Sequence, residues 1–286
     1  MKKNRIRVLS LFLLILPTAL LPALDLGTYF SIGNIALDTA GAPASNYPWG
    51  LTVEGTQLLN DSMSIEAGYT YDPILKNIIH TNFVYKEQFF TIGVGPFFGL
   101  FNSTSALMQS GISTSVTIEW PGVLFAKFRA DNTIGGRLVQ TGDYLQELNL
   151  ISAGFYVPNA ICSLNMLTKR YTEKTDTSEA VSGLTQYTFT TDLYKKNVPY
   201  RVLLTFGYQQ LQRILDTEAA ETDTYTLGSL ILGTKLTVRI TPDISVIADL
   251  TSSIYSFGLD ELLGASLSDS EYAYFFHLIT GVQFKI

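Results

Sequence analysis

Apolar and polar residues alternate along most of this chain, most clearly in its last stretch, residues 271–286. Every second residue from Tyr272 to Ile286 is apolar or aromatic except for one threonine, whereas the residues between them include His277 and Lys285. Side chains of a β-strand point to opposite faces with a period of two, so this stretch is predicted to be one long strand with an apolar face. Because about nine to eleven residues let a tilted strand cross a bilayer, it is long enough to span one.

The same alternation recurs upstream and predicts about fourteen strands in all, with twelve or sixteen as alternatives. The other predicted strands cover residues 26–33, 49–58, 63–71, 79–85, 90–100, 112–120, 124–131, 144–157, 162–169, 187–193, 200–208, 229–240 and 244–254. These features predict an all-β fold, a transmembrane antiparallel up-and-down β-barrel that the last strand closes.

The connections between these strands alternate in length, as they do between the two ends of an outer-membrane barrel. Tight turns are expected at residues 60–61, 86–88, 121–122, 158–159, 195–199 and 241–243. Longer polar loops are expected at residues 38–46, 102–111, 132–143, 171–182, 212–224 and 257–269, with one short connection at 72–77. Because the predicted number of strands is even, the start of the first strand and the end of the last strand both lie at the end of the barrel that carries the tight turns.

Charged residues fall on only one of the two faces of most predicted strands. The candidates that would line an enclosed lumen are Glu54, Glu66, Lys127, Arg129, Lys169, Arg201, Lys235, Arg239 and Asp249. A Lys or Arg that faces lipid at mid-depth costs roughly 2–4 kcal/mol, so the uncharged face is predicted to contact lipid. The charged face is therefore predicted to line the lumen.

A soluble, secreted β-sandwich is the alternative fold, because it also alternates and has short turns. A sandwich would turn its apolar face inward and leave edge strands to protect. Tyr85, Trp120, Tyr194 and Tyr200 all lie next to predicted tight turns, which is the placement of an interfacial aromatic girdle. This placement favours the barrel.

The first residues are predicted to be removed before folding. Residues 1–23 have a basic head followed by an apolar run, which is typical of a secretory signal peptide, and residues 24–286 then form a single barrel domain. Four of the 19 Lys and Arg residues lie in the signal, which leaves 15 against 25 Asp and Glu and a net charge near −10. That balance argues against a nucleic-acid partner. The single cysteine, Cys162, excludes an internal disulfide, and no Cys/His spacing suggests a metal site or another cofactor.

The signal peptide, the fourteen or so alternating strands and the aromatic last strand resemble a Gram-negative outer-membrane β-barrel. In size and strand count the chain is similar to the monomeric OmpG-type porins. The resemblance implies a monomer in outer-membrane lipid and a last strand that the barrel-assembly machinery reads. The residues of this terminal signal would be Tyr274, Phe276, Leu278, Phe284 and Ile286. Fatty-acid transporters of the FadL type also have fourteen strands, but here no hatch precedes the strand at residue 26, so that resemblance is weaker.

The predicted lumen suits passive diffusion of small polar solutes. A ring of fourteen tilted strands has a backbone diameter of roughly 28 Å, which side chains reduce to roughly 15 Å. Opposed charges on the wall orient polar solutes and disfavour apolar ones. The alternative is that these charges pair across a packed lumen, with Phe125 and Phe275 narrowing it further.

An enzyme is not expected. The chain holds only two histidines, His80 and His277, on the predicted inward face, and neither has an evident catalytic partner in the sequence. A structural or surface-interaction role, adhesin-like or in assembly, is the remaining alternative. It would use the acidic loops at residues 212–224 and 257–269.

Overall fold

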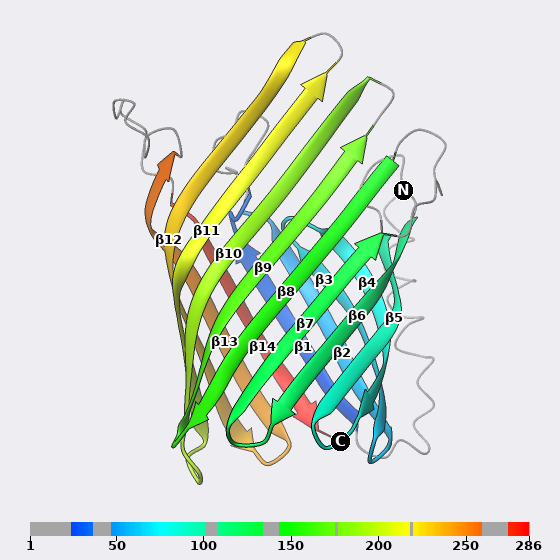
Figure 1. Cartoon of the computed structure of the whole chain (residues 1–286). Helices are drawn as coiled ribbons and strands as arrows, with labels where there is room; N and C mark the ends of the chain where they lie inside the picture. Colours follow the sequence, from blue (N-terminus) through cyan, green and yellow to red (C-terminus); the bar gives the residue numbers. More distant parts are fainter. Residues whose placement is uncertain are drawn as a thin grey trace, which may run out of the picture.

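The computed structural model describes residues 24–36, 47–100, 108–133, 143–174, 177–217, 220–258 and 274–285, which form fourteen antiparallel strands closed into a ring (Figure 1). This confirms the predicted all-β barrel and its strand count. The predicted signal peptide, the loop at 38–46 and Ile286 lie outside the described residues. Among the described residues, no helix has the length and apolar character needed to cross a membrane.

The strands follow the chain around the ring, each paired with its sequence neighbours. They are β1 (Leu24–Gly33), β2 (Trp49–Asn60), β3 (Met63–Asp72), β4 (Lys76–Lys86), β5 (Phe90–Leu100), β6 (Met108–Trp120), β7 (Leu124–Thr133), β8 (Asp143–Val157), β9 (Ala160–Lys174), β10 (Ser178–Tyr194), β11 (Tyr200–Thr217), β12 (Ala220–Thr241), β13 (Ile244–Gly258) and β14 (Phe276–Lys285). The tight turns after even-numbered strands β2 to β12 define the turn end of the barrel. The opposite end is the loop end.

The ring closes between β1 and β14, with Asp25 opposite Lys285 at the turn end and Gly33 opposite His277 toward the loop end. Beyond this ladder Asn34 continues the pairing with its side chain. Its amide nitrogen donates to the Tyr274 carbonyl (2.8 Å), and its amide oxygen accepts from the backbone N–H of Phe276 (2.9 Å). One buried asparagine thus extends the seam where the regular ladder has stopped.

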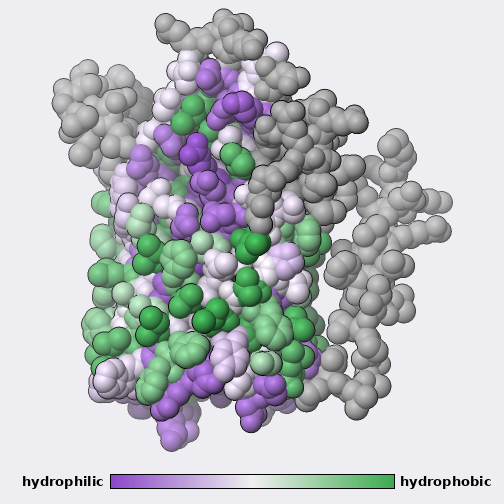
Figure 2. Space-filling view, turned by 45° about the vertical axis from the view of Figure 1, so that its right-hand side comes forward, coloured by the Kyte–Doolittle hydropathy of each residue, from purple (hydrophilic) through white to green (hydrophobic). Residues whose placement is uncertain are grey.

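The outer face of the ring carries a belt of large apolar side chains. On β6 the exposed large apolar residues are Ile112, Val116, Ile118 and Trp120, and the residues between Val116 and Trp120 on the other face, Thr117 and Glu119, are half-buried and polar. Figure 2 shows the belt on one face as a hydrophobic zone with polar zones above and below it. The burial of a strand's two faces therefore follows the period of two that the sequence predicted.

Strands β9 to β12 are longer than predicted, at 15, 17, 18 and 22 residues. The predicted loops at 171–182 and 212–224 are wrong, because most of their residues continue these strands well beyond the neighbouring part of the ring (Figure 1). Both faces are polar in much of these stretches, so the apolar alternation fades there. Backbone pairing nevertheless continues, because ladder hydrogen bonds do not depend on an apolar face.

The last strand is shorter than predicted, because β14 begins at Phe276 rather than at residue 271. Tyr274 therefore lies outside the strand. Phe275 leaves the strand path and is fully buried, with its backbone N–H donating to Ser253 Oγ (2.7 Å). One aromatic residue of the expected girdle also differs: Tyr194 pairs with Arg201 on the inward face, and the Arg201 guanidinium lies 5.7 Å from its ring centre.

Candidate functional site

The connection between β3 and β4 folds into the barrel instead of away from it. We call residues Asp72–Lys76 the inward turn. Oδ1 of Asp72 accepts hydrogen bonds from the backbone N–H groups of Ile74 and Leu75, both at 2.9 Å. Lys76 adopts a positive φ of 65°, and its Nζ donates to the Pro73 carbonyl at 3.0 Å. The side chain of Asp72 thus holds the turn in shape from within.

The inward turn reaches the opposite wall of the lumen. Oδ2 of Asp72 forms an ion pair with Nζ of Lys169, which lies on β9, and the two side chains are only 14% and 17% exposed. Ile74 and Leu75 are 3% and 1% exposed. The inward turn is therefore held against the opposite wall both by its apolar tip and by a buried ion pair.

The tip packs into an apolar cluster that we call the lumen core. Its buried members are Ile35, Ile74, Leu75, Tyr171, Leu184, Leu211 and Phe275, and Ile78, Leu148 and Leu227 pack against it. These residues come from the segment after β1, the inward turn, β4 and the strands β8 to β12, together with the segment before β14. Part of the lumen near the loop end is consequently filled as a protein interior is filled.

All nine predicted lumen candidates lie on inward faces, as the register places them opposite to the exposed apolar belt. Lys169 belongs to the lumen core region. The other eight lie between the inward turn and the turn end, and they are Glu54, Glu66, Lys127, Arg129, Arg201, Lys235, Arg239 and Asp249. The turn-end half of the lumen is therefore lined with charges of both signs.

Several of these charges lie close together. Glu54 interacts electrostatically with Arg129 and Lys235 across the lumen, and with Glu66 on the neighbouring strand. Lys235 stands directly opposite Asp249 on adjacent strands. Acidic and basic groups thus face one another across this part of the lumen.

Other candidates are paired with residues that the sequence did not single out. Arg129 forms an ion pair with Asp131 at 2.7 Å. Arg201 binds both carboxylate oxygens of Asp192 through Nε and Nη2. Neither acidic partner was among the nine predicted lumen candidates, although both share the inward face with their arginine.

The aromatic residues expected to narrow the lumen do lie inside it. Phe125 is 8% exposed, packs edge-on against Tyr156 at 5.8 Å, and has Nζ of Lys127 over its ring at 5.1 Å. Phe275 belongs to the lumen core. Phe97, which the sequence did not mark, is 1% exposed on the inward face of β5.

The two histidines also face inward. His277 lies near the ion pair of Lys169 and Asp72, with which it interacts electrostatically. His80 interacts in the same way with Arg129 and Asp131. Across the described part of the chain, no group of three or more His, Cys, Asp or Glu side chains could hold a metal ion.

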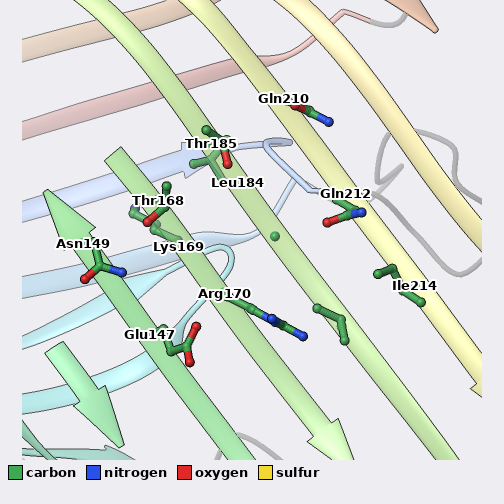
Figure 3. A pocket seen from close by; sticks show the side chains of 12 residues that line it. Glu147, Asn149, Thr168, Lys169, Arg170, Leu184, Thr185, Gln210, Gln212 and Ile214 are labelled. Carbon is green, nitrogen blue, oxygen red and sulfur yellow. The ribbon is translucent and has the colours of Figure 1, made fainter. Parts of the chain in front are cut away.

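Two cavities lie on opposite sides of the wall formed by β8 to β11. The first, of about 300 Å³, is on the outward face and is lined by polar residues such as Glu147, Asn149 and Arg170 (Figure 3). The next outward residues toward the turn end, among them Ile151, are apolar and exposed. The first cavity thus marks the height at which the apolar belt ends.

The second cavity, of about 230 Å³, is inside the lumen directly beneath the inward turn. Asp72, Pro73 and Ile74 form its roof, and inward residues of β9 to β14 form its wall. We call it the lumen chamber. Its lining includes Ile35, Ile74 and Leu184 of the lumen core.

Comparison with known proteins finds likeness in fold only. No family model and no curated protein matches the chain. Solved structures do match: OmpT, an outer membrane protein of Vibrio cholerae (9% identity, 93% of this chain and 97% of that chain, TM-score 0.44), an anion-selective porin from Comamonas acidovorans (8%, 93% and 99%, 0.42) and an outer membrane channel from Pseudomonas putida F1 (9%, 93% and 96%, 0.45). At such identities and TM-scores these matches carry no argument about function, which must come from the barrel itself.

Proposed function

We propose that this protein is an outer-membrane β-barrel, exported by a cleaved signal peptide, through whose lumen small hydrophilic solutes diffuse. The observation that carries the proposal is the division of the wall between an apolar outer belt and an ionised inner face. A charged side chain at the lipid face costs about 2–4 kcal/mol at mid-depth, whereas apolar side chains are favoured there. The barrel is therefore suited to lipid outside and water inside.

The charged half of the lumen supports passage of polar solutes. Glu54 and Glu66 stand on one wall while Arg129 and Lys235 stand on others, so a transverse field acts on a solute between them. Such a field disfavours apolar compounds, which makes a transporter of hydrophobic compounds the weaker alternative.

The inward turn is the constriction in this proposal. No described member of the lumen core comes from β5 to β7, so the remaining passage would follow that wall, where Phe97 narrows it. Solutes would pass beside the turn rather than through the ring's full width. We expect a conductance well below that of an unobstructed fourteen-strand ring.

Single-channel recording in planar bilayers tests the proposal. The wild-type protein should give stable open steps, and Leu75→Ser should give larger ones because a hydroxyl in the lumen core weakens docking of the turn. Leu164→Ser makes the same exchange on the lipid-facing side of β9, where the side chain is 66% exposed, and is the matched control that should leave the step unchanged. If neither the wild type nor Leu75→Ser conducts at any voltage, the channel proposal is lost.

A structural barrel with a closed lumen is the second candidate. The observation in its favour is the depth of the lumen core, since Leu75 and Leu211 are each 1% exposed and Phe275 is fully buried. In this case the folded wild-type barrel would not conduct, whereas Leu75→Ser would. The two variants therefore separate an open passage from a sealed one.

We further propose that the barrel is a monomer without hydrolytic activity. His277 interacts electrostatically with the carboxylate of Asp72, which is already bound by Lys169 and by two backbone N–H groups. A catalytic dyad would need that carboxylate free to orient the imidazole. Loss of a measurable esterase or protease activity in His277→Ala would contradict this, and light scattering in detergent would report the oligomeric state.

A further inference from the structure

A row of small polar residues crosses five neighbouring strands on the inward face. Directly opposite one another stand Ser163 on β9, Thr190 on β10, Thr205 on β11, Gly233 on β12 and Thr251 on β13. His277 on β14 continues the row. These residues are far apart in sequence, and only the stagger of the strands brings them to one line. We call it the hydroxyl row.

The glycine within the row keeps its centre open. A Cβ at Gly233 would lie 3.1 Å from Thr205 Cβ and 3.1 Å from Thr251 Oγ1. A larger side chain there would press against both threonines. With glycine, the two hydroxyl-bearing side chains flank a gap in the wall.

A second set of polar groups stands beside the row. Asn165 donates from its amide to the hydroxyl oxygens of Thr188 (3.4 Å) and Thr190 (3.3 Å). Gln186, one step nearer the loop end, donates to Gln209 at 3.1 Å. The Thr188 hydroxyl, which accepts from Asn165, still has its own hydrogen to donate, whereas the Thr190 hydroxyl also bonds Ser163 Oγ at 2.6 Å.

The lumen chamber lies against this wall. Thr188, Thr190, Thr205 and Thr251 line it together with Gln186 and His277. Toward the loop end, Ile74 of the inward turn, Leu184 of β10 and Ile231 of β12 supply an apolar surface. A pocket with one apolar side and a few convergent polar groups is the usual form of a site for a small molecule.

Charge excludes ions as the natural occupant. Among the described residues that line the chamber, the only Asp, Glu, Lys or Arg side chains are those of Asp72 and Lys169, which are bound to each other. An ion entering the chamber would lose water without meeting a free counter-charge. A neutral solute with many hydroxyl groups would instead exchange its water contacts for hydroxyl and amide contacts.

We propose that the lumen chamber is a binding site for a neutral polyhydroxylated solute, a monosaccharide or polyol, held by Thr205, Thr251 and the groups beside them. The solute's hydroxyls meet the hydroxyl row, while its C–H faces meet Ile74 and Ile231. The inference rests on the proposed function only for the route by which the solute arrives. A binding site in the lumen makes the barrel selective for one class of solute, whereas a barrel without such a site selects by size alone.

Binding is measured apart from conduction, by saturation-transfer NMR with glucose on the detergent-folded barrel. The double variant Thr205→Val/Thr251→Val keeps side-chain shape and removes two hydroxyls, so the Kd for glucose should rise at least about tenfold. Thr237→Val, on the inward face of β12 nearer the turn end, is the matched control and should leave the Kd unchanged. Gluconate and glucosamine, which carry a charge, should bind several-fold more weakly than glucose.

The outcomes are distinguishable from those of the channel experiment. Absence of saturation transfer in the wild type, or an equal Kd in the double variant, overturns the binding site even if the barrel conducts. Glucose binding that is lost in the double variant supports the site even if the barrel never conducts, in which case the channel proposal alone is lost. Circular dichroism confirms that each variant folds before binding is compared.

Discussion

Two ion pairs inside this barrel have similar chemistry but different surroundings. The side chains of Lys169 and Asp72 are 17% and 14% exposed beside the lumen core, whereas Arg201, bound to Asp192 near the turn end, is 50% exposed. The first pair is closed off by the inward turn, and the second faces the open half of the lumen. The lumen wall is therefore packed like a protein interior in the half that holds the lumen core, and it is more accessible to water in the turn-end half.

The largest difference between the halves should appear when one partner of each pair is removed. Lys169→Met leaves Asp72 as an uncompensated charge in a closed site, which should cost about 3–5 kcal/mol in the free energy of unfolding. Arg201→Met should cost less, about 1–3 kcal/mol, because the Arg201 side chain is half-exposed, although Asp192, which it leaves unpaired, is itself only 14% exposed. Urea unfolding of the detergent-folded barrel measures both, and equal losses would mean that the two halves are equally wet.

Truncating apolar side chains sharpens the same contrast. Leu75→Ala removes a 1% exposed side chain from the lumen core and should cost about 3 kcal/mol through lost contacts and a residual cavity. Leu203→Ala, on the inward face of β11 in the other half, should cost about 1 kcal/mol because this side chain is only half-buried. Similar costs in urea unfolding would show that the lumen core is not a packed interior.

Single charges in the open half should act on ions rather than on stability. Glu54→Gln removes a negative charge from the wetted wall and should shift the permeability ratio toward anions by about a factor of two. Thr56→Val, on the same face of β2, should have no effect on the reversal potential. A reversal potential that does not respond to Glu54→Gln would place this carboxylate outside the ion path.

The smallest expected effect concerns the turns at the two ends. Lys76 in the inward turn has a positive φ of 65°, and Asn159 and Asn197 at the turn end have 63° and 72°. Asparagine tolerates this conformation better than lysine does. Asn159→Lys should therefore lower the free energy of unfolding by about 0.3 kcal/mol. Lys76→Asn gains the same backbone preference but loses the Nζ hydrogen bond to the Pro73 carbonyl, so it should lower the free energy of unfolding by about 0.5 kcal/mol. A rise in either variant, measured by urea unfolding, would contradict this account.

The alternation of residues was enough to predict the strands and their faces. Ile112, Val116 and Trp120 follow the period of two and are exposed on the outer belt, as a lipid-facing strand requires. The strand ends were harder to place, because β9 to β12 continue where both faces are polar. Hydropathy does not reveal these parts of the strands, because pairing between backbones does not require apolar side chains.

The inward turn and the hydroxyl row were missed for different reasons. The sequence Asp72–Lys76 looks like any short connection, and its only unusual sign is a pair of large apolar residues, Ile74 and Leu75, at the tip. Thr205 and Thr251 belong to strands whose stagger the sequence does not specify. Contacts across a ring depend on that stagger, so only the closed structure brings them together.

The pairing of β1 with β14 sets a condition on how the molecule assembles. Other neighbouring strands are joined by connections that keep them near each other, but the Tyr29 hydroxyl meets the Gln283 amide across 254 positions of sequence. The entropic penalty of such an encounter grows with the length of the intervening chain. The sheet must therefore curl until its two free edges meet, and Asn34, which bonds Tyr274 and Phe276 at that junction, is placed to fasten them once they do.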